Sequence, residues 1–418
     1  MDKEINGLHL HVIKTQKFKT ITISLKFTNL LEENTAYKRT MISFLMASSS
    51  KKYPNNYALA RALDYLYGAV FSTKSSCKGQ SHVIHTYLEG IDPSYIDDDH
   101  YLIDLIDILQ EIIMHPNVDE NGFDRQSFEI CKDEYALRFE EDKDDKNAYA
   151  TEKLFEYMGE NTPLAVESYG KEEQVKLLDP LDLKNYYFEM LEKDRKDLYI
   201  VGNINDEQIE MIEQKLCFPE KIYHYPSCYT FKSSKNQVLE VIEDQNITQT
   251  RLLMGYTING NFLTDNNVDY VLLNGILGGF SHSLLFKTIR EKYSLCYSID
   301  SHYDAFNGVI TINAGIEDYD IERVKELISQ IIEDIILGNF DEELLEITKT
   351  MLINSAKVSV DDPYSMIAKS FNKDLCNLKS SYSNIEALNA LTKAQICNAA
   401  KSMKRDTVFI LRGSNNED

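Results

Sequence analysis

The segment YGAVFS at residues 67–72 recurs as YSLCYS at residues 293–298, which is an offset of 226 positions. A second match follows in the same order, with GID at residues 90–92 and GIE at residues 315–317, at an offset of 225. Repeated matches in one order and at nearly one spacing are typical of an internal duplication. The sequence therefore predicts two copies of one structural unit.

An amphipathic helix is predicted after each copy of the second match, at an offset of 223. Steps of three and one between apolar residues place these side chains on a single helical face. The positions are Leu105, Ile108, Leu109, Ile112 and Ile113 in the first copy and Ile328, Ile331, Ile332, Ile335 and Ile336 in the second. The duplication divides the chain into a first half, 1–217, and a second half, 238–418. Residues 218–237, which contain two prolines and show no hydrophobic period, are predicted to be a linker.

Strand and helix patterns alternate within each half. Strands are predicted at 20–27, 81–88, 197–204, 250–258, 308–316 and 406–413. Helices are predicted at 57–67, 99–114, 120–140, 283–292, 319–337 and 341–357. Glycines and hairpin-length gaps separate several strands, so a mainly antiparallel sheet covered by helices is expected in each half. The predicted fold class is α+β with two tandem homologous halves.

The charge of the chain limits its partners and its location. Its 418 residues include 44 basic and 67 acidic side chains, a net charge of −23. A field of this sign repels nucleic acid and anionic membrane, so neither is expected as a partner. The apolar run IDLIDILQEIIM is interrupted by acids, and MDKEINGLHLHVIK at the start lacks the basic flank of a signal peptide. We therefore expect a cytoplasmic location.

The seven cysteines are widely scattered and form no CxxC pair. An odd number of cysteines without paired spacing predicts reduced thiols. It also argues against a zinc site with cysteine ligands.

Residues 278–299, GGFSHSLLFKTIREKYSLCYSI, contain Arg290 and Tyr297 at a spacing of seven. The duplication provides an internal comparison, because Arg290 falls opposite Asp64 and Tyr297 falls opposite Phe71. The aromatic ring is kept in both copies, whereas the hydroxyl and the guanidinium occur only in the second. Packing explains a ring, but it does not explain a phenol and a cation placed together at one strand–helix corner.

A structural interpretation of this corner remains open at this point. Arg290 can form a surface ion pair with Glu291 or Glu317, which contributes little energy. The neighbouring glycines can simply end a helix. Spacing alone does not choose between these interpretations and a functional one.

Three parts of the sequence resemble the pitrilysin/insulinase family of zinc metallopeptidases, which includes the mitochondrial processing peptidases. The run LLNGILGGFSHSLLFKTIREKYSLCYSIDSHYDAFNGVITINAGI is similar to the signature of the family's second half. ALARALDYLYGAVFSTKSS at 58–76 is similar to the segment after its zinc-binding helix. ESYGKEEQVKLLDPLDLKNYYFEML followed by DLYIVGNI is similar to the end of its first half. The resemblance covers nearly the whole chain, including the duplication.

The resemblance implies a sheet of six strands in each half, with helices packed on one face. Active members bind zinc through a His-x-x-Glu-His helix, in which the glutamate takes a proton from the bound water. That helix is expected near residues 41–54, but no histidine or glutamate occurs from Asn34 to Ser81. His9 and His11 share one face of a predicted strand, whereas His82 and His85 lie on opposite faces of another. We therefore expect no metal ligand in this chain.

The resemblance also implies a role for the second half. Arg290 and Tyr297 match the family's pair of donors to the scissile carbonyl, an oxyanion-type contribution to catalysis. The strand at Phe71, Ser72 and Thr73 matches its peptide-binding edge, and the glycine turn at residues 278–279 is a candidate substrate-contacting loop. Both Gly278 and Gly279 are therefore predicted to bind substrate.

The expected function is that of a non-zinc subunit in a heterodimeric peptidase, inactive alone. A homologous partner with His-x-x-Glu-His supplies the zinc, and the two chains form a chamber for a peptide substrate. The alternative is a catalytically inactive subunit that only captures peptide or regulates a partner enzyme.

Overall fold

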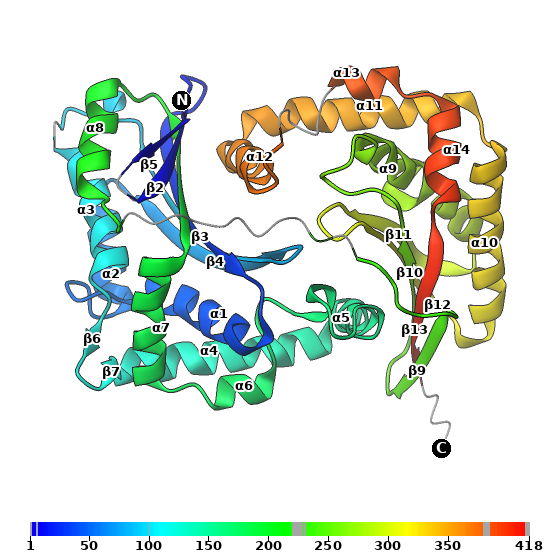
Figure 1. Ribbon diagram of the computed structural model, residues 1–418, viewed down its shortest axis with the longest axis horizontal. Coiled ribbons are helices and arrows are strands. Elements are labelled where there is room, and N and C mark those ends of the chain that lie inside the picture. The colour runs from blue at the N-terminus through cyan, green and yellow to red at the C-terminus, as the bar shows by residue number, and fades with distance from the viewer. Residues whose placement is uncertain are drawn as a thin grey trace. The chain divides into compact units, whose positions relative to one another are not determined.

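The computed structural model describes residues 2–5, 7–98, 100–219, 229, 231–378 and 385–413. The chain forms two compact units, whose elements are labelled in Figure 1. Unit 1 takes its residues from Met1–Glu141, Val166–Pro226 and Val360–Phe371, and unit 2 from Asp142–Ala165, Ser227–Ser359 and Asn372–Asp418. The predicted linker at 218–237 falls partly on residues outside the described ranges.

Unit 1 is built on a six-stranded sheet with the order β1-β2-β8-β3-β5-β4. Its strands are β1 (Asp2–Ile5), β2 (Leu8–Lys14), β3 (Thr20–Leu30), β4 (Val70–Lys78), β5 (Ser81–Ile91) and β8 (Arg195–Gly202). Strands β2 and β8 pair in parallel, and the other neighbours are antiparallel. A separate two-stranded ribbon joins β6 (Val118–Asp119) to β7 (Gly122–Phe123).

One face of this sheet forms the main hydrophobic core of unit 1 with a layer of helices (Figure 1). Alternate residues of β3, such as Ile23, Leu25 and Phe27, are fully buried there because successive side chains of a strand point to opposite faces. The helices are α1 (Glu33–Ser48), α2 (Asn56–Tyr65), α3 (Tyr101–Met114), α4 (Arg125–Asp144), α6 (Glu172–Lys176), α7 (Pro180–Lys193) and α8 (Asp206–Lys215).

Unit 2 repeats the arrangement, and its described residues form a five-stranded sheet with the order β11-β12-β10-β13-β9. The strands are β9 (Leu239–Gln245), β10 (Thr250–Thr257), β11 (Cys296–Asp304), β12 (Val309–Ile316) and β13 (Lys404–Gly413). Strands β13 and β9 pair in parallel, as β8 and β2 do in unit 1. The helices are α9 (Asn267–Asn274), α10 (Ile321–Leu337), α11 (Glu342–Val358), α13 (Ile385–Ala390) and α14 (Lys393–Lys401).

Each unit also receives one helix from the other half of the sequence. Helix α5 (Lys146–Met158) belongs to unit 2, where Leu154 packs with Leu253 and Phe409 of the sheet. The beginning of α12 (Pro363–Leu375) belongs to unit 1, where the Phe371 ring lies 6.0 Å from His85. These contacts lie on the sheet faces opposite the main helical layers. The two sequence copies have therefore exchanged equivalent segments.

The α+β class and the helices packed on the sheets are confirmed. The paired amphipathic helices are α3 and α10, and nearly all of the apolar positions assigned to them are buried. Among the described residues, no helix is both long and apolar enough to cross a membrane. The thiols differ from the expectation in one respect: Cys77, Cys131, Cys217, Cys296 and Cys397 are free, but Cys376 is disulfide-bonded.

Candidate functional site

The candidate site in unit 2 begins at an edge strand, β11, which has an equivalent edge strand, β4, in unit 1. The two strands have the same length and differ by the offset of 226. Each is preceded by a residue in the left-handed region, Gly68 at φ 74° and Ser294 at φ 53°. An edge strand presents backbone N–H and C=O groups that can pair with an added peptide strand.

Arg290 lies in a π-helical segment, Phe286–Lys292 (η4), that packs on β11. Segments of this kind are frequent at functional sites. Its side chain is exposed, and the guanidinium carbon lies 4.7 Å from the centre of the Phe286 ring. Among the described residues, no carboxylate lies within ion-pair distance of Arg290, so the surface pair with Glu291 or Glu317 does not form.

Tyr297 is displayed on the surface by an irregularity in β11. The pairing register with β12 shifts between Cys296 and Ser298, so Tyr297 sits in a bulge. Bulges redirect a side chain and are common next to active sites. The ring is 66% exposed, and its hydroxyl donates a long hydrogen bond of 3.4 Å to Glu317. The phenol is therefore held only weakly and can donate to another oxygen.

The charge of Arg290 reaches the first residue of β11. Burial raises the pKa of the Cys296 thiol to about 11, and the Arg290 guanidinium opposes that rise. Cys296 is adjacent to Tyr297 in the strand. The structure thus brings a free cation and an exposed phenol to the start of one edge strand.

The predicted peptide-binding residues Phe71, Ser72 and Thr73 all lie in β4. Phe71 packs against the hydrophobic core, and Thr73 Oγ1 donates to the backbone oxygen of Ser43 at 2.5 Å. Only Ser72 is exposed. Any peptide at this strand would therefore bind mainly through hydrogen bonds to the backbone of β4. Substrate binding there stays a prediction.

The glycine pair does not form the predicted turn. Gly278 and Gly279 end a π-helical segment, Gly275–Gly279 (η3), which continues α9. Gly278 is buried, and a Cβ there would lie 2.6 Å from the backbone nitrogen of Ser301 in β11. Gly278 thus allows η3 to approach the edge strand closely, whereas Gly279 is exposed. Substrate contact by either glycine stays a prediction.

Helix α1 occupies the region where the zinc helix is expected, although it ends at Ser48. Thr40, Ser43 and Phe44 have the i, i+3, i+4 spacing of His-x-x-Glu-His. Thr40 Oγ1 lies 2.6 Å from Ser75 Oγ of β4 and donates to the Ser168 backbone oxygen at 2.6 Å. Hydroxyl groups thus satisfy one another where a metal site would need imidazole and carboxylate ligands.

Two further residues extend the contacts of this helix. Ser75 Oγ also lies 2.8 Å from His82 Nε2 of β5. The Phe44 ring stacks on Tyr135 of α4, with 5.3 Å between the ring centres. Both partners come from elements packed against α1, so the face is filled by side chains of unit 1 itself.

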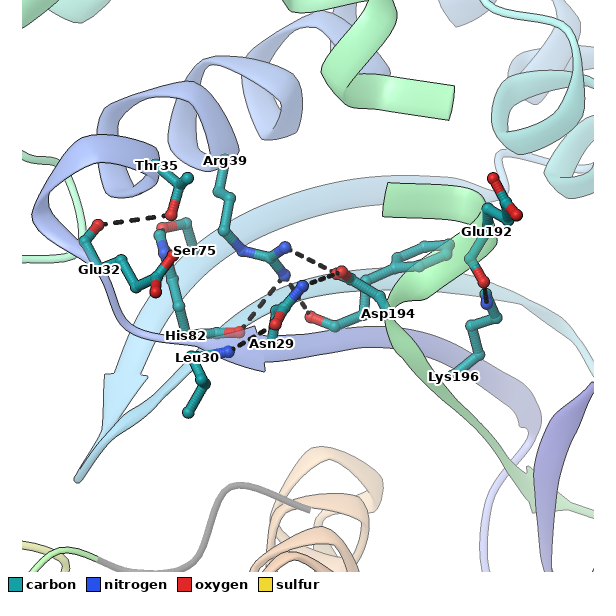
Figure 2. Close-up of polar contacts among 11 residues, drawn as sticks. Asn29, Leu30, Glu32, Thr35, Arg39, Ser75, His82, Glu192, Asp194 and Lys196 are labelled. Atoms are coloured by element: carbon teal, nitrogen blue, oxygen red, sulfur yellow. Dashed lines mark hydrogen bonds and ion pairs between the residues drawn. The ribbon is translucent and has the colours of Figure 1, made fainter. Parts of the chain in front are cut away.

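A buried ion pair fixes the same helix to the sheet. Figure 2 shows the Arg39 guanidinium between the Asp194 carboxylate and two backbone carbonyls. Arg39 Nη1 lies 2.7 Å from Asp194 Oδ2, and both side chains are fully buried. Asn29 donates to the second carboxylate oxygen at 2.7 Å. Sequence patterns missed this network. The helical spacing of Arg39 from Ala36 and Ile42 could have indicated that its side chain is buried, but nothing indicated its partner.

The donor set near α1 does not fit zinc. Burial lowers the pKa of His82 well below its usual value, and the charge of Arg39 lowers it further. A guanidinium that disfavours the imidazolium also disfavours a divalent cation at the same place. Across the described residues, no group of three or more His, Cys, Asp or Glu side chains is arranged to hold a metal ion.

Comparisons with known proteins agree with this architecture. The family model "Peptidase M16 inactive domain" matches residues 178–352. The chain is 27% identical to the "Probable inactive metalloprotease YmfF" of Bacillus subtilis, over 98% of this chain and 96% of that protein. It is 21% identical to the B. subtilis "Antilisterial bacteriocin subtilosin biosynthesis protein AlbE", over 86% of this chain and 89% of that protein.

A crystal structure of a conserved protein from Enterococcus faecalis V583 superposes with a TM-score of 0.95 at 30% identity, covering 100% of this chain and 99% of that chain. Its agreement extends over both units and includes both halves of the duplication. The family model and the inactive relative bear out the resemblance to the pitrilysin/insulinase peptidases. The chain belongs to the M16 peptidase family, in which one relative that matches nearly its whole length is named as a probable inactive metalloprotease.

Proposed function

We propose that this chain is the non-zinc subunit of a heterodimeric M16 peptidase. In this role Arg290 and Tyr297 donate hydrogen bonds to the scissile carbonyl of an extended peptide. The observation that carries the proposal is the start of β11. The segment η4, which contains Arg290, packs on this strand, and a bulge there displays Tyr297. A homologous partner with His-x-x-Glu-His would supply the zinc and its activated water.

The chemistry of the two donors suits a carbonyl that gains negative charge. A guanidinium stays protonated at any physiological pH and presents several N–H groups. A phenol adds a neutral donor and leaves the net charge of the site unchanged. Donors aimed at a developing oxyanion typically contribute a rate factor of about a hundred or more each. The contribution requires both groups to be free of other strong partners.

A peptide substrate is supported by the open edges of the two sheets. Both β4 and β11 end their sheets among the described residues. An extended peptide can add to either strand through backbone hydrogen bonds, as in other cases of strand addition. The name of AlbE assigns that relative to bacteriocin biosynthesis, which is compatible with a peptide substrate. In this proposal the chain also forms part of the peptide-binding chamber and works in the cytoplasm.

The alternative proposal is a subunit that captures peptide or regulates a partner without donating to the carbonyl. It is favoured by the 3.4 Å contact of Tyr297 with Glu317, which can be the phenol's resident partner. On this alternative the edge of β4 alone binds peptide. The two proposals differ in whether substitution of the donors changes turnover.

The experiment uses this chain purified together with its His-x-x-Glu-His partner, with zinc measured in each chain and in the complex. Tyr297→Phe and Arg290→Ala are each expected to lower kcat about a hundredfold with little change in KM, because transition-state donors are lost. Arg323→Ala is the matched control, since Arg323 also lies over an aromatic ring, Tyr293, at 5.8 Å.

The results separate the two proposals. Wild-type turnover in the double variant, with the complex intact, would exclude the donor role and leave the peptide-capturing role. Stoichiometric zinc in the isolated chain, together with proteolysis in the absence of a partner, would overturn both.

A further inference from the structure

The two units differ at the edge that lies opposite β4 and β11. In unit 1, strand β1 covers the outer edge of β2, and helix α8 packs on α3. In unit 2 the strand equivalent to β2 is β9, because each pairs in parallel with the last strand of its half. Strand β9 ends its sheet in the described part of the chain, which contains no counterpart of β1 or α8 there.

A groove of about 580 Å³ lies between β9, β13 and α10. Its α10 wall includes Gln330 and Glu333, which correspond to Asp107 and Gln110 of α3 at the offset of 223. In unit 1 those two residues contact Lys215 of α8, through an ion pair and through a hydrogen bond to its backbone oxygen. The groove is therefore the position that α8 fills in unit 1.

The groove is acidic rather than apolar. Four glutamates line it, together with two cations, Lys325 and Arg405. Lys325 already pairs with Glu240 at 2.8 Å and with Glu322 at 2.9 Å. Its counterpart in α3 at the same offset is the buried Leu102. The groove thus differs from a site for an apolar helix and carries excess carboxylate charge, which favours a cationic occupant.

The adjacent edge of β9 combines this charge with exposed apolar side chains. Ile242 is 50% exposed, and Val238, just before the strand, is 44% exposed. Both lie on the same side of the extended chain as Glu240, which lines the groove. An open edge with exposed β-branched residues is suited to pair with another strand.

Unit 1 contains an intramolecular example of such pairing. Strand β1 adds antiparallel to β2, with Ile5 opposite Leu8. Lys3 of that added strand forms an ion pair with Glu213 of α8 in the helical layer. A short strand with a lysine that reaches a helical carboxylate is therefore an arrangement that this fold accommodates.

We propose that the groove between β9 and α10 binds an extended segment of a partner protein in which basic and β-branched residues alternate. The segment adds a strand to β9. Its lysine or arginine side chains face α10, where their apolar stems cover Ile242 and their charges reach Glu326 and Glu333. Its β-branched side chains lie on the opposite face of the sheet, beside Val241. This surface belongs to unit 2 and is independent of Arg290 and Tyr297, so the proposal does not rest on the proposed peptidase role.

The test uses the full chain and a fluorescein-labelled ten-residue peptide of alternating Lys and Val, with binding followed by fluorescence anisotropy. The paired variant Glu326→Lys/Glu333→Lys is expected to raise Kd about tenfold or more, because attraction becomes like-charge repulsion. Glu207→Lys/Glu210→Lys on α8 makes the same change of charge at exposed positions of unit 1 and is expected to leave Kd unchanged. The milder Glu333→Gln is expected to give a smaller rise.

Backbone pairing is tested with the same peptide carrying N-methyl groups on alternate residues, which removes donors from one edge. Loss of binding by this peptide supports strand addition. Equal affinity of the groove variant and the control variant would show attraction by net charge alone and overturn the proposal. Dimerisation of the chain that competes with the peptide would assign the edge to a second copy and would also overturn it.

Discussion

His82 and His85 are neutral imidazoles inside unit 1, on opposite faces of β5. Burial is the main reason that the pKa of each lies well below its usual value, and nearby cations lower both further. A neutral His85 accepts a hydrogen bond from Lys26 Nζ on Nδ1 at 2.8 Å and donates from Nε2 to Ser76 Oγ at 2.7 Å. Both histidines therefore become easier to protonate when the unit 1 sheet unfolds.

The stability of the protein is expected to fall as the pH drops below about 6.5, the pKa of histidine in an unfolded chain. Below that pH the unfolded chain binds protons that the folded His82 and His85 cannot, so the unfolded state is favoured. Each histidine contributes a slope of about 1.4 kcal/mol per pH unit until its folded pKa is reached, and its stabilisation is fully present above pH 6.5. Urea unfolding at several pH values between 5 and 7.5 measures the slope.

Variants assign this slope to particular residues. His82→Gln and His85→Gln are each expected to flatten it, whatever their effect on stability at neutral pH. The exposed His100→Gln serves as the control and is expected to leave the slope unchanged. His9 and His282, whose pKa values burial also lowers, leave a residual slope. A slope as steep in the double variant as in the wild type would contradict this assignment.

The sequence allowed some of these residues to be identified and concealed others. Arg290 and Tyr297 could be singled out because the duplicated copy has Asp64 and Phe71 in their places and because the pair matches the donors of the peptidase family, and their role stays a prediction. The pair Arg39 and Asp194 could not, because 155 positions separate them and no periodicity indicates which buried charges meet. The burial of Lys26 could not be predicted either, because strand alternation predicts which face of the sheet its side chain is on but not which element covers that face.

Close packing at Gly278, beside a hydrogen bond of 2.8 Å from Ser301 Oγ to Asn274 Oδ1, sets the distance between η3 and β11. A Cβ at Gly278 would lie 2.6 Å from the Ser301 nitrogen and 2.7 Å from its Oγ, and the backbone of a paired strand cannot yield easily. Gly278→Ala is therefore expected to lower the free energy of unfolding by about 1–3 kcal/mol, the usual cost of overpacking. Urea unfolding followed by circular dichroism gives the value.

Gly279→Ala provides the matched comparison within the same helical segment. There the nearest atoms belong to Asn274, at 3.1 Å, so less strain is expected. Both changes gain helix propensity equally, so their difference isolates the contact with Ser301. Equal stability of the two variants would show that η3 can move away from β11.

The exchanged helices show what sequence patterns leave undetermined at this scale. Ala150, Leu154 and Met158 recur at helical spacing in α5, so an apolar face could be recognised there. The pattern cannot say which sheet that face covers, because any flat apolar surface satisfies it. The close approach of Met158 to Gly255 is the local reason for the choice, since a side chain at Gly255 would meet the Met158 sulfur at 2.5 Å.

At the level of the molecule, the exchange makes the predicted halves incomplete as folding units. A fragment 1–217 keeps α5 without the sheet that it covers and loses the beginning of α12, which covers Lys26 and His85. A fragment 238–418 keeps the beginning of α12 without the sheet that it covers and loses α5. Each fragment alone is expected to aggregate or to lack fixed tertiary structure, because an apolar helix face or a sheet face is left exposed.

Co-expression of the two fragments is expected to give a soluble complex, since each supplies the segment that the other lacks. Size-exclusion chromatography and near-ultraviolet circular dichroism of each fragment and of the mixture provide the measurement. Two independently folded monomers that ignore each other would contradict this expectation.

The contact of Met158 with Gly255 also carries a consequence for inheritance. A mutation in codons 142–165 alters the interior of a unit whose remaining residues are all encoded after codon 226. Compensating changes for that segment should arise downstream, and those for residues 360–371 upstream. Recombination between diverged genes at the midpoint of the reading frame would then combine a helix from one parent with a sheet from the other. Their packing surfaces would not match, even though each parental protein folds.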